Sequence, residues 1–214
     1  MPTLPPAVPR RGNRASRAFW SQALCLTGWK IAGNLPNLPR FVVICAPHTS
    51  NWDFCVAMAV VHGLGFNVCW IGKHTLFRWP YGVVMRWLGG IPVVRSERHG
   101  LVQQIADAFR TEEQLVIGIT PEGTRKRARW KTGFYHIAVE ADVPIVPAWV
   151  DYRSRTLGFA KPFVPTGDAD ADIAYLKDFY APFARAGKRA ELYDLREDPH
   201  LDVDGGDFLD RADK

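Results

Sequence analysis

His48 and Asp53 lie five positions apart in the segment HTSNWD, between apolar runs at 41–46 and 54–61. Histidine is the side chain most easily poised as a base near neutral pH. A carboxylate that accepts a hydrogen bond from one ring nitrogen leaves the other nitrogen available to take up a proton. The pair therefore predicts general-base chemistry, although the same polar residues also suit the start of a helix.

A second polar segment, Pro121-Glu122-Gly123-Thr124-Arg125, follows another apolar run. Glycine allows close approach of a ligand to the backbone, and a hydroxyl and a guanidinium both bind phosphate oxygens. The alternative is a turn followed by a solvated basic face, because further basic residues follow up to Lys131. The basic run 125–131 also suits contact with nucleic acid or lipid headgroups.

Two more cations follow apolar runs. Arg95 comes after the segment GGIPVV, and Lys73 comes after an apolar run that ends at Gly72. An arginine at the end of a buried strand suits a bidentate contact with phosphate. The alternative for Arg95 is a surface ion pair with Glu97, and an equally ordinary surface role is open for Lys73.

Apolar runs that suit strands alternate with segments of helical periodicity. We predict strands at 41–46, 67–71, 90–94, 115–119 and 145–150, and helices at about 51–62, 80–88, 99–111, 133–140 and 171–180. This alternation predicts an α/β fold, a single layered domain with a mostly parallel central sheet flanked by helices. Ligands bind beyond the carboxyl ends of the strands in such sheets. His48, Lys73, Arg95 and the segment 121–125 are therefore expected to converge at one edge.

The ends of the chain differ in composition from its middle. Residues 1–15 are rich in proline and arginine and are predicted to be disordered. Residues 16–32 have the pattern of an amphipathic helix, which either packs on the body or lies in a membrane interface. Residues 188–214 form an acidic tail that is predicted to be mobile, and 191–214 alone hold nine acidic and three basic side chains. The rest of the chain is basic, which favours an anionic partner.

Four cysteines lie in apolar contexts without C-x-x-C spacing, and we expect reduced thiols in a cytosolic protein; they are Cys25, Cys45, Cys55 and Cys69. We expect no signal peptide at the N-terminus. The segment 54–72 has no charged residue and is long enough to span a bilayer. Gly63 and Gly65 near its middle favour a helix, a turn and a strand instead.

Taken in order, four blocks of this sequence resemble the glycerolipid acyltransferase family, which includes 1-acylglycerol-3-phosphate acyltransferases of the PlsC type. His48 and Asp53 match its H-x4-D block, 89–95 the second block, 121–125 the third, and the VPIVP segment at 143–147 the fourth. The resemblance covers about 41–167. It implies a glycerol-3-phosphate acyltransferase-like fold, with 33–187 as the acyltransferase domain.

The resemblance also implies a reaction. His48 would remove a proton from a hydroxyl of the acceptor, and Asp53 would orient the imidazole and stabilise the imidazolium. The resulting alkoxide would attack the thioester of acyl-CoA or acyl-carrier protein, with no metal and no other cofactor. The residues that would hold the acceptor's phosphate and glycerol are Lys73, Arg95, Glu122, Gly123, Thr124, Arg125 and Lys131.

The implied acceptor is a lysophospholipid such as 1-acylglycerol-3-phosphate, which dwells in a bilayer. The enzyme is therefore expected in the cytoplasm, bound peripherally to the inner face of the cell membrane, with no nucleic-acid partner. The alternatives are another lysolipid or hydroxylated acceptor, or a non-catalytic lipid-binding protein. A serine hydrolase using Ser50 or Ser96 is a further alternative, but the sequence has no G-x-S-x-G motif.

Overall fold

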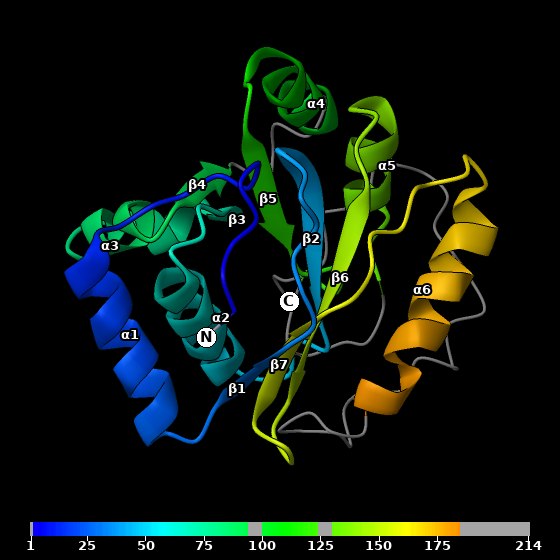
Figure 1. The fold of residues 1–214 in the computed structure, drawn as a ribbon. Coiled ribbons are helices and arrows are strands. Elements are labelled where there is room, and N and C mark those ends of the chain that lie inside the picture. Colours follow the sequence, from blue (N-terminus) through cyan, green and yellow to red (C-terminus); the bar gives the residue numbers. More distant parts are fainter. Residues whose placement is uncertain (1, 94–99, 124–129, 185–214) are drawn as a thin grey trace.

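A mostly parallel β-sheet forms the centre of the computed structural model, with helices on both of its faces (Figure 1). The structure describes residues 2–93, 100–123 and 130–184. The strands of this part are β1 (Lys30–Ala32), β2 (Arg40–Ala46), β3 (Cys69–Lys73), β4 (Gly90–Val93), β5 (Leu115–Ile119), β6 (Ile145–Asp151) and β7 (Thr156–Phe159). They are ordered β1-β7-β6-β2-β5-β3-β4 across the sheet.

The helices alternate with these strands along the chain, as the sequence predicts. They are α1 (Arg14–Leu26), α2 (Asn51–Leu64), the short 3-10 helix η1 (His74–Phe77), α3 (Tyr81–Trp87), α4 (Leu101–Thr111), α5 (Gly133–Glu140) and α6 (Ala169–Ala184). The α/β class and the mostly parallel sheet are confirmed. Two short strands, β1 and β7, were not predicted.

Parallel pairing brings the carboxyl ends of several strands to one edge of the sheet. Strand β2 is parallel to both of its neighbours, β5 and β6, and β3 is parallel to β5 and β4. Only β7 runs antiparallel to β6 among the described pairs. The loops after β2, β3, β5 and β6 therefore leave the sheet on the same side, where ligands bind in folds of this kind.

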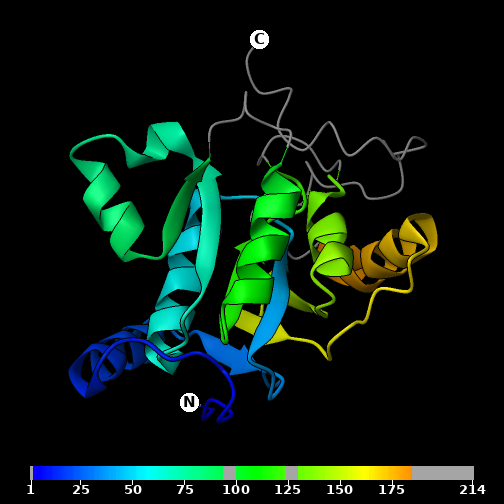
Figure 2. The same cartoon turned by 90° about the horizontal axis from the view of Figure 1, so that it is seen from above.

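Strand β2 is buried on both faces of the sheet. Phe41 and Val43 belong to one apolar cluster, which includes α2 residues such as Val60. Val42 and Ile44 belong to a second cluster, formed with residues of α4, α5 and α6. Figure 2 shows α1 and α6 on opposite sides of the molecule, with the sheet between them. The loop that follows β2 thus leaves a strand that is packed on both of its faces.

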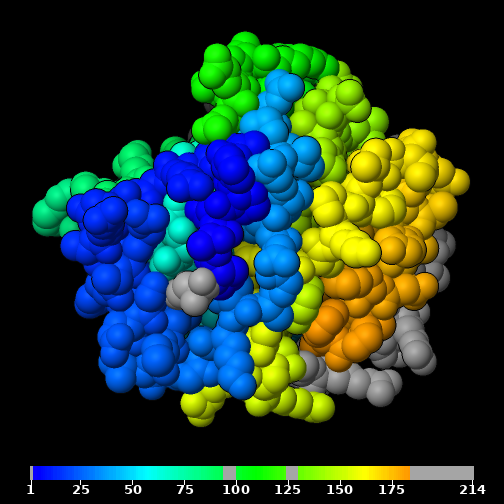
Figure 3. Space-filling model, viewed as in Figure 1, coloured from blue at the N-terminus to red at the C-terminus, as the bar shows by residue number. Residues whose placement is uncertain are grey.

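The N-terminal segment lies against the body of the protein. The disorder that we predicted for 1–15 is therefore not found in its described residues. Val8 is 1% exposed, and the backbone N–H groups of Arg11 and Asn67 donate to the carbonyls of Gly65 and Pro9, both at 2.9 Å. Figure 3 shows this segment packed along the surface beside α1. Backbone pairing stabilises the segment here, which composition alone does not reveal.

The segment 16–32, which we predicted as one helix, forms most of helix α1 and then strand β1. The helix ends at Leu26, and Gly28 adopts a left-handed conformation with φ +73°. Residues 30–32 instead pair in parallel with β7, and the N–H of Lys30 donates to the carbonyl of Arg155 at 2.8 Å. The boundary of the acidic tail at 188 lies outside the described residues.

The uncharged segment 54–72 is the helix, turn and strand that we predicted. Helix α2 ends at Leu64, and Gly65 takes a left-handed conformation with φ +71° before β3 begins at Cys69. Across residues 2–93, 100–123 and 130–184, no helix is both long and apolar enough to traverse a bilayer.

A buried histidine joins the three helices on one side of the molecule. His62 of α2 is 3% exposed and stacks between Trp20 of α1 and Trp87 of α3, with ring centroids 5.5 and 5.1 Å away. Burial, with a smaller contribution from the nearby charge of Arg11, lowers the pKa of His62. The neutral ring therefore packs as an aromatic group. It fixes α1 and α3 to α2, the helix whose first turn contains Asp53.

Candidate active site

The first turn of α2 fixes Asp53. Ser50 is the N-cap residue, and its hydroxyl accepts from the N–H of Trp52 at 3.2 Å. Asp53 Oδ2 accepts from the N–H groups of Thr49 and Ser50, both at 2.7 Å, which completes a capping box. The carboxyl group is 2% exposed. Both interpretations of this segment therefore hold, because the helix cap is also what orients the carboxylate.

His48 faces that carboxylate. Its Nδ1 lies 3.3 Å from Asp53 Oδ2, and its side chain is 20% exposed. A proton on Nδ1 then points to the carboxylate, and Nε2 is left with a lone pair that can accept a proton. The arrangement suits a general base at the carboxyl edge of the sheet.

Glu122 ties the loop after β5 to the loop after β2. It is 1% exposed, and its Oε1 accepts from the backbone N–H of His48 at 2.9 Å. We predicted Glu122 as a ligand of the substrate, and the contact that the structure describes is with the catalytic loop. This bond joins two of the segments that the sequence expects at one edge.

Replacing Glu122 with alanine should leave the N–H of His48 without its acceptor, at a cost of about 1–3 kcal/mol of folding stability. We expect turnover to fall as well, because the base is no longer held in place. Glu122→Gln is the matched control, since an amide oxygen can still accept that hydrogen bond. Denaturant unfolding and turnover of both variants test this, and equal behaviour of the two variants would contradict it.

Tyr152, which sequence reasoning did not select, completes the surroundings of Asp53. It follows β6, and its hydroxyl donates to Asp53 Oδ1. Burial, together with this hydrogen bond, raises the pKa of Tyr152, so the hydroxyl stays protonated and acts as a donor. The rule that located His48 and Glu122, a polar residue just beyond the carboxyl end of a parallel strand, also points to Tyr152.

The predicted phosphate ligands are only partly described. Lys73 is the last residue of β3 and so lies at the same edge of the sheet. Gly123 has φ +59°, and the side chain of Lys131 lies against it, with Lys131 Cδ 3.3 Å from where a Cβ would stand. The N–H of Lys131 also donates to the carbonyl of Pro121 at 2.8 Å. Lys131 thus belongs to the turn after β5; Arg95, Thr124 and Arg125 lie outside the described residues.

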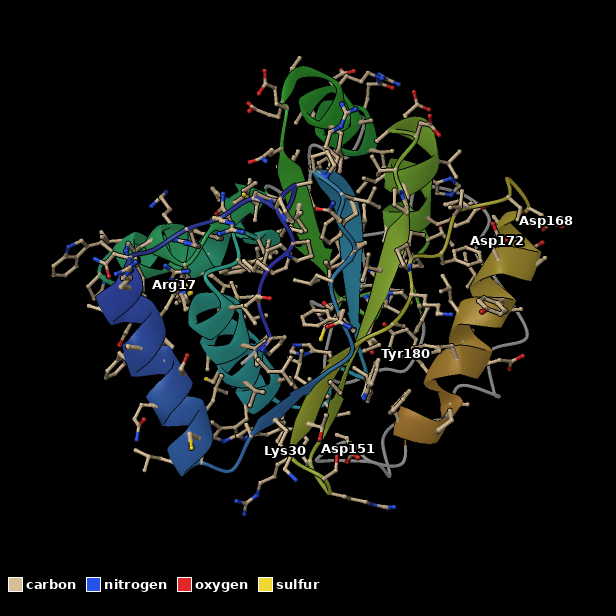
Figure 4. All side chains as sticks on the ribbon, viewed as in Figure 1. Arg17, Lys30, Asp151, Asp168, Asp172 and Tyr180 are labelled. Carbon is tan, nitrogen blue, oxygen red and sulfur yellow. The ribbon has the colours of Figure 1, made fainter. Side chains whose placement is uncertain are left out.

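Tyr180 of α6 joins the two strands behind the catalytic loop. It points from its helix toward the sheet (Figure 4), and its hydroxyl lies 2.8 Å from the carbonyl oxygen of Ile44 and 3.0 Å from that of Ala148. It is fully buried, and burial raises its pKa far above the usual range, which keeps the hydroxyl a donor. The strand that leads to His48 is therefore held rigidly from the side of α6.

The nucleophiles near the site are not set up for covalent catalysis. Burial, with the nearby charges of Asp53 and Glu122, raises the pKa of the Cys45 thiol, and a protonated thiol is a poor nucleophile. The hydroxyl of Ser50 serves as the cap acceptor described above. A covalent intermediate on the Cys45 thiol is therefore disfavoured.

Comparison with known proteins identifies the family. The model of the family described as Acyltransferase matches residues 30–151, more than half of the chain. The chain belongs to the Acyltransferase family. The matched region includes His48, Asp53 and Glu122 and ends one residue before Tyr152.

Individual relatives of this Acyltransferase family member carry related names. The chain is 31% identical to the 1-acyl-sn-glycerol-3-phosphate acyltransferase of Escherichia coli, over 54% of this chain and 49% of that protein. It is 31% identical to human 1-acyl-sn-glycerol-3-phosphate acyltransferase beta, over 63% of this chain and 50% of that protein. The chain thus matches only about half the length of these curated relatives.

A solved structure supports the fold of this acyltransferase family member. The crystal structure of the 1-acyl-sn-glycerophosphate (LPA) acyltransferase PlsC from Thermotoga maritima matches with a TM-score of 0.57 and 20% sequence identity. The match covers 78% of this chain and 75% of the other. The likeness confirms the α/β architecture that the sequence predicts.

Proposed function

We propose that this protein transfers a fatty acyl group from an acyl thioester to a hydroxyl of a lysophospholipid, with His48 as the general base. The observation that carries the proposal is the 3.3 Å approach of His48 Nδ1 to Asp53 Oδ2 at the carboxyl edge of the sheet. Membership of the Acyltransferase family and the names of the relatives support the same reaction class.

In the proposed reaction, Nε2 of His48 takes the proton of the acceptor hydroxyl as its oxygen attacks the thioester carbonyl. The ester C–O bond forms, the C–S bond breaks, and the sulfur leaves as a thiolate that takes up the proton. Asp53 stabilises the imidazolium between these steps. Because a thioester is already activated, a positioned base and an oriented acceptor supply the main requirements of catalysis.

We propose that cations at the same edge bind the phosphate of the acceptor. Lys73 is the last residue of β3, and Lys131 lies in the loop after β5. Gly123 lets the side chain of Lys131 pack close to the backbone of that loop. The sequence adds Arg95, Thr124 and Arg125 to this set. The names of the relatives support 1-acylglycerol-3-phosphate as the acceptor. The donor that we propose, acyl-CoA or acyl-carrier protein, rests on the resemblance of the sequence blocks alone.

Product analysis by mass spectrometry tests this function. The purified protein is incubated with acyl-CoA, and separately with acyl-carrier protein, together with a panel of lysolipids that includes 1-acylglycerol-3-phosphate. We expect a diacyl product and one equivalent of free thiol, both dependent on the acceptor. Lipid binding without thioester consumption would instead favour a non-catalytic lipid-binding protein.

We also propose that the segment formed by η1 and α3 docks on the membrane that holds the acceptor. Its exposed side chains are largely apolar and aromatic; they include Leu76, Trp79 (88% exposed), Tyr81, Val83, Val84 and Trp87. The segment carries Arg78 and Arg86, and no acidic residue occurs from 54 to 93. Aromatic rings with nearby cations suit the interface of an anionic leaflet.

Helix α1 lies on the same side of the molecule as α3 in both ribbon views (Figures 1 and 2). It exposes Phe19 and Leu26, and His62 stacks with a tryptophan from each of the two helices. This arrangement supports the amphipathic helix as a second part of the same docking surface. The acceptor would then reach His48 from a bilayer beside the carboxyl edge.

Trp79→Ala combined with Tyr81→Ala should weaken sedimentation with vesicles that contain anionic lipid, because two interfacial rings are lost. Turnover of a monomeric short-chain acceptor should change little, since neither ring contacts the predicted catalytic pair. Tyr175→Ala is the matched control, because Tyr175 is 61% exposed on α6, on the opposite side of the molecule. Unchanged vesicle binding in the double variant would overturn the proposed docking surface.

A further inference from the structure

We propose that Tyr152 is a positioning residue that holds the carboxylate of Asp53 and thereby tunes the basicity of His48. The inference rests on the proposed function of the His48–Asp53 pair. It extends that function to a residue outside the region that the family model matches.

The two oxygens of Asp53 have separate partners. Oδ2 accepts from the N–H groups of Thr49 and Ser50 and faces Nδ1 of His48. Oδ1 accepts from the hydroxyl of Tyr152. The hydroxyl thus holds the oxygen that faces away from the imidazole, while the two backbone N–H groups keep Oδ2 beside Nδ1 of His48.

Tyr152 is itself held by parts of the chain that are distant in sequence. The ring of Trp29 packs edge-on against it, with centroids 5.3 Å apart and planes at 84°. Next to it, Asp151 accepts from the N–H and the hydroxyl of Ser154, at 3.3 and 2.7 Å, and so shapes the turn between β6 and β7. Figure 4 shows Lys30 and Asp151 at the same corner of the molecule.

Further hydrogen bonds hold β1 and the turn between β6 and β7 together at that corner. Arg155 donates from its guanidinium to the carbonyl of Thr27 at 3.1 Å and accepts from the N–H of Lys30 at 2.8 Å. The parallel pairing of β1 with β7 continues from there. The hydroxyl of Tyr152 therefore has a fixed place, and it reaches Asp53 from the turn between β6 and β7.

The hydrogen bond has a chemical consequence for His48. Because burial keeps the Tyr152 hydroxyl protonated, it draws negative charge toward Oδ1. The charge that Oδ2 offers to the imidazolium is reduced accordingly.

Tyr152→Phe removes the hydroxyl and keeps the ring. We expect kcat on the acid side of its pH profile to fall up to about 10-fold, with little change in KM, because a one-unit shift of the limb changes the fraction of free base there about tenfold. The acid limb of the profile of kcat against pH should move to higher pH, because Oδ2 now stabilises the imidazolium more strongly. Tyr175→Phe, which removes an exposed hydroxyl from α6, is the matched control and should behave as wild type.

NMR titration of the His48 ring gives a readout that needs no turnover. A higher pKa of His48 in Tyr152→Phe than in wild type supports the inference, even if the wild-type protein proves inactive and the proposed function fails. A fall in kcat with an unmoved acid limb and an unmoved His48 pKa would show that Tyr152 acts only through packing, and would overturn the inference. Wild-type kcat and an unmoved pKa would also overturn the inference.

Discussion

His48→Ala is expected to abolish acyl transfer while the protein remains folded. General-base catalysis contributes about 10²–10⁴-fold in rate, and no other imidazole faces Asp53 in the described part of the chain. The side chain is partly exposed in a loop, so its removal leaves the apolar clusters on both faces of the sheet intact. Thiol release from acyl-CoA in the presence of acceptor measures the effect, and circular dichroism checks the fold.

Two controls separate this effect from a general loss of structure. His136→Ala removes a histidine of α5 that packs against Tyr135 and should keep most of the activity. Added imidazole should partly restore turnover in His48→Ala, because the free base can occupy the space beside Asp53. Turnover like that of wild type in His48→Ala would remove the basis of the proposed mechanism.

The sequence predicts the central sheet and the meeting of His48 with Glu122 because both depend on strong local patterns. Apolar runs of strand length locate β2 and β5, and parallel pairing then places the loops after them at one edge. The hydrogen bond between the His48 N–H and Glu122 can form because both loops leave the sheet at that edge. What the pattern does not give is the role of Glu122, since a buried carboxylate can bind either a substrate or a loop.

Tyr152 follows a predicted strand, but its contact with Asp53 depends on long-range pairing that no local pattern records. Strand β7 has four residues, and β1 has three. Their pairing fixes the turn between β6 and β7 and the corner at Trp29. Long-range pairing also explains why the prediction for the N-terminal segment is wrong. Its composition indicates disorder, but backbone hydrogen bonds to residues 65–67 hold it against the body.

Asp53→Asn should lower turnover about 10²- to 10³-fold and leave the helix cap in place. Two backbone N–H groups point at the Oδ2 position, so the amide oxygen of asparagine must take that position. The amide nitrogen then takes the place of Oδ1 and can donate to the oxygen of Tyr152. Both backbone N–H groups therefore keep their acceptor, and an acceptor still faces Nδ1 of His48.

What Asp53→Asn removes is the negative charge, while the orientation of the ring is kept. A pair of unit charges at about 4 Å contributes about 4 kcal/mol at an effective dielectric constant of 20, which corresponds to about 10³-fold in rate. Without the charge the imidazolium is less stable, the pKa of His48 falls, and the acid limb of the kcat profile moves to lower pH. Tyr152→Phe is expected to move the same limb in the opposite direction. Measuring both profiles tests whether Asp53 acts through charge, and a limb that moves to higher pH in Asp53→Asn would contradict it.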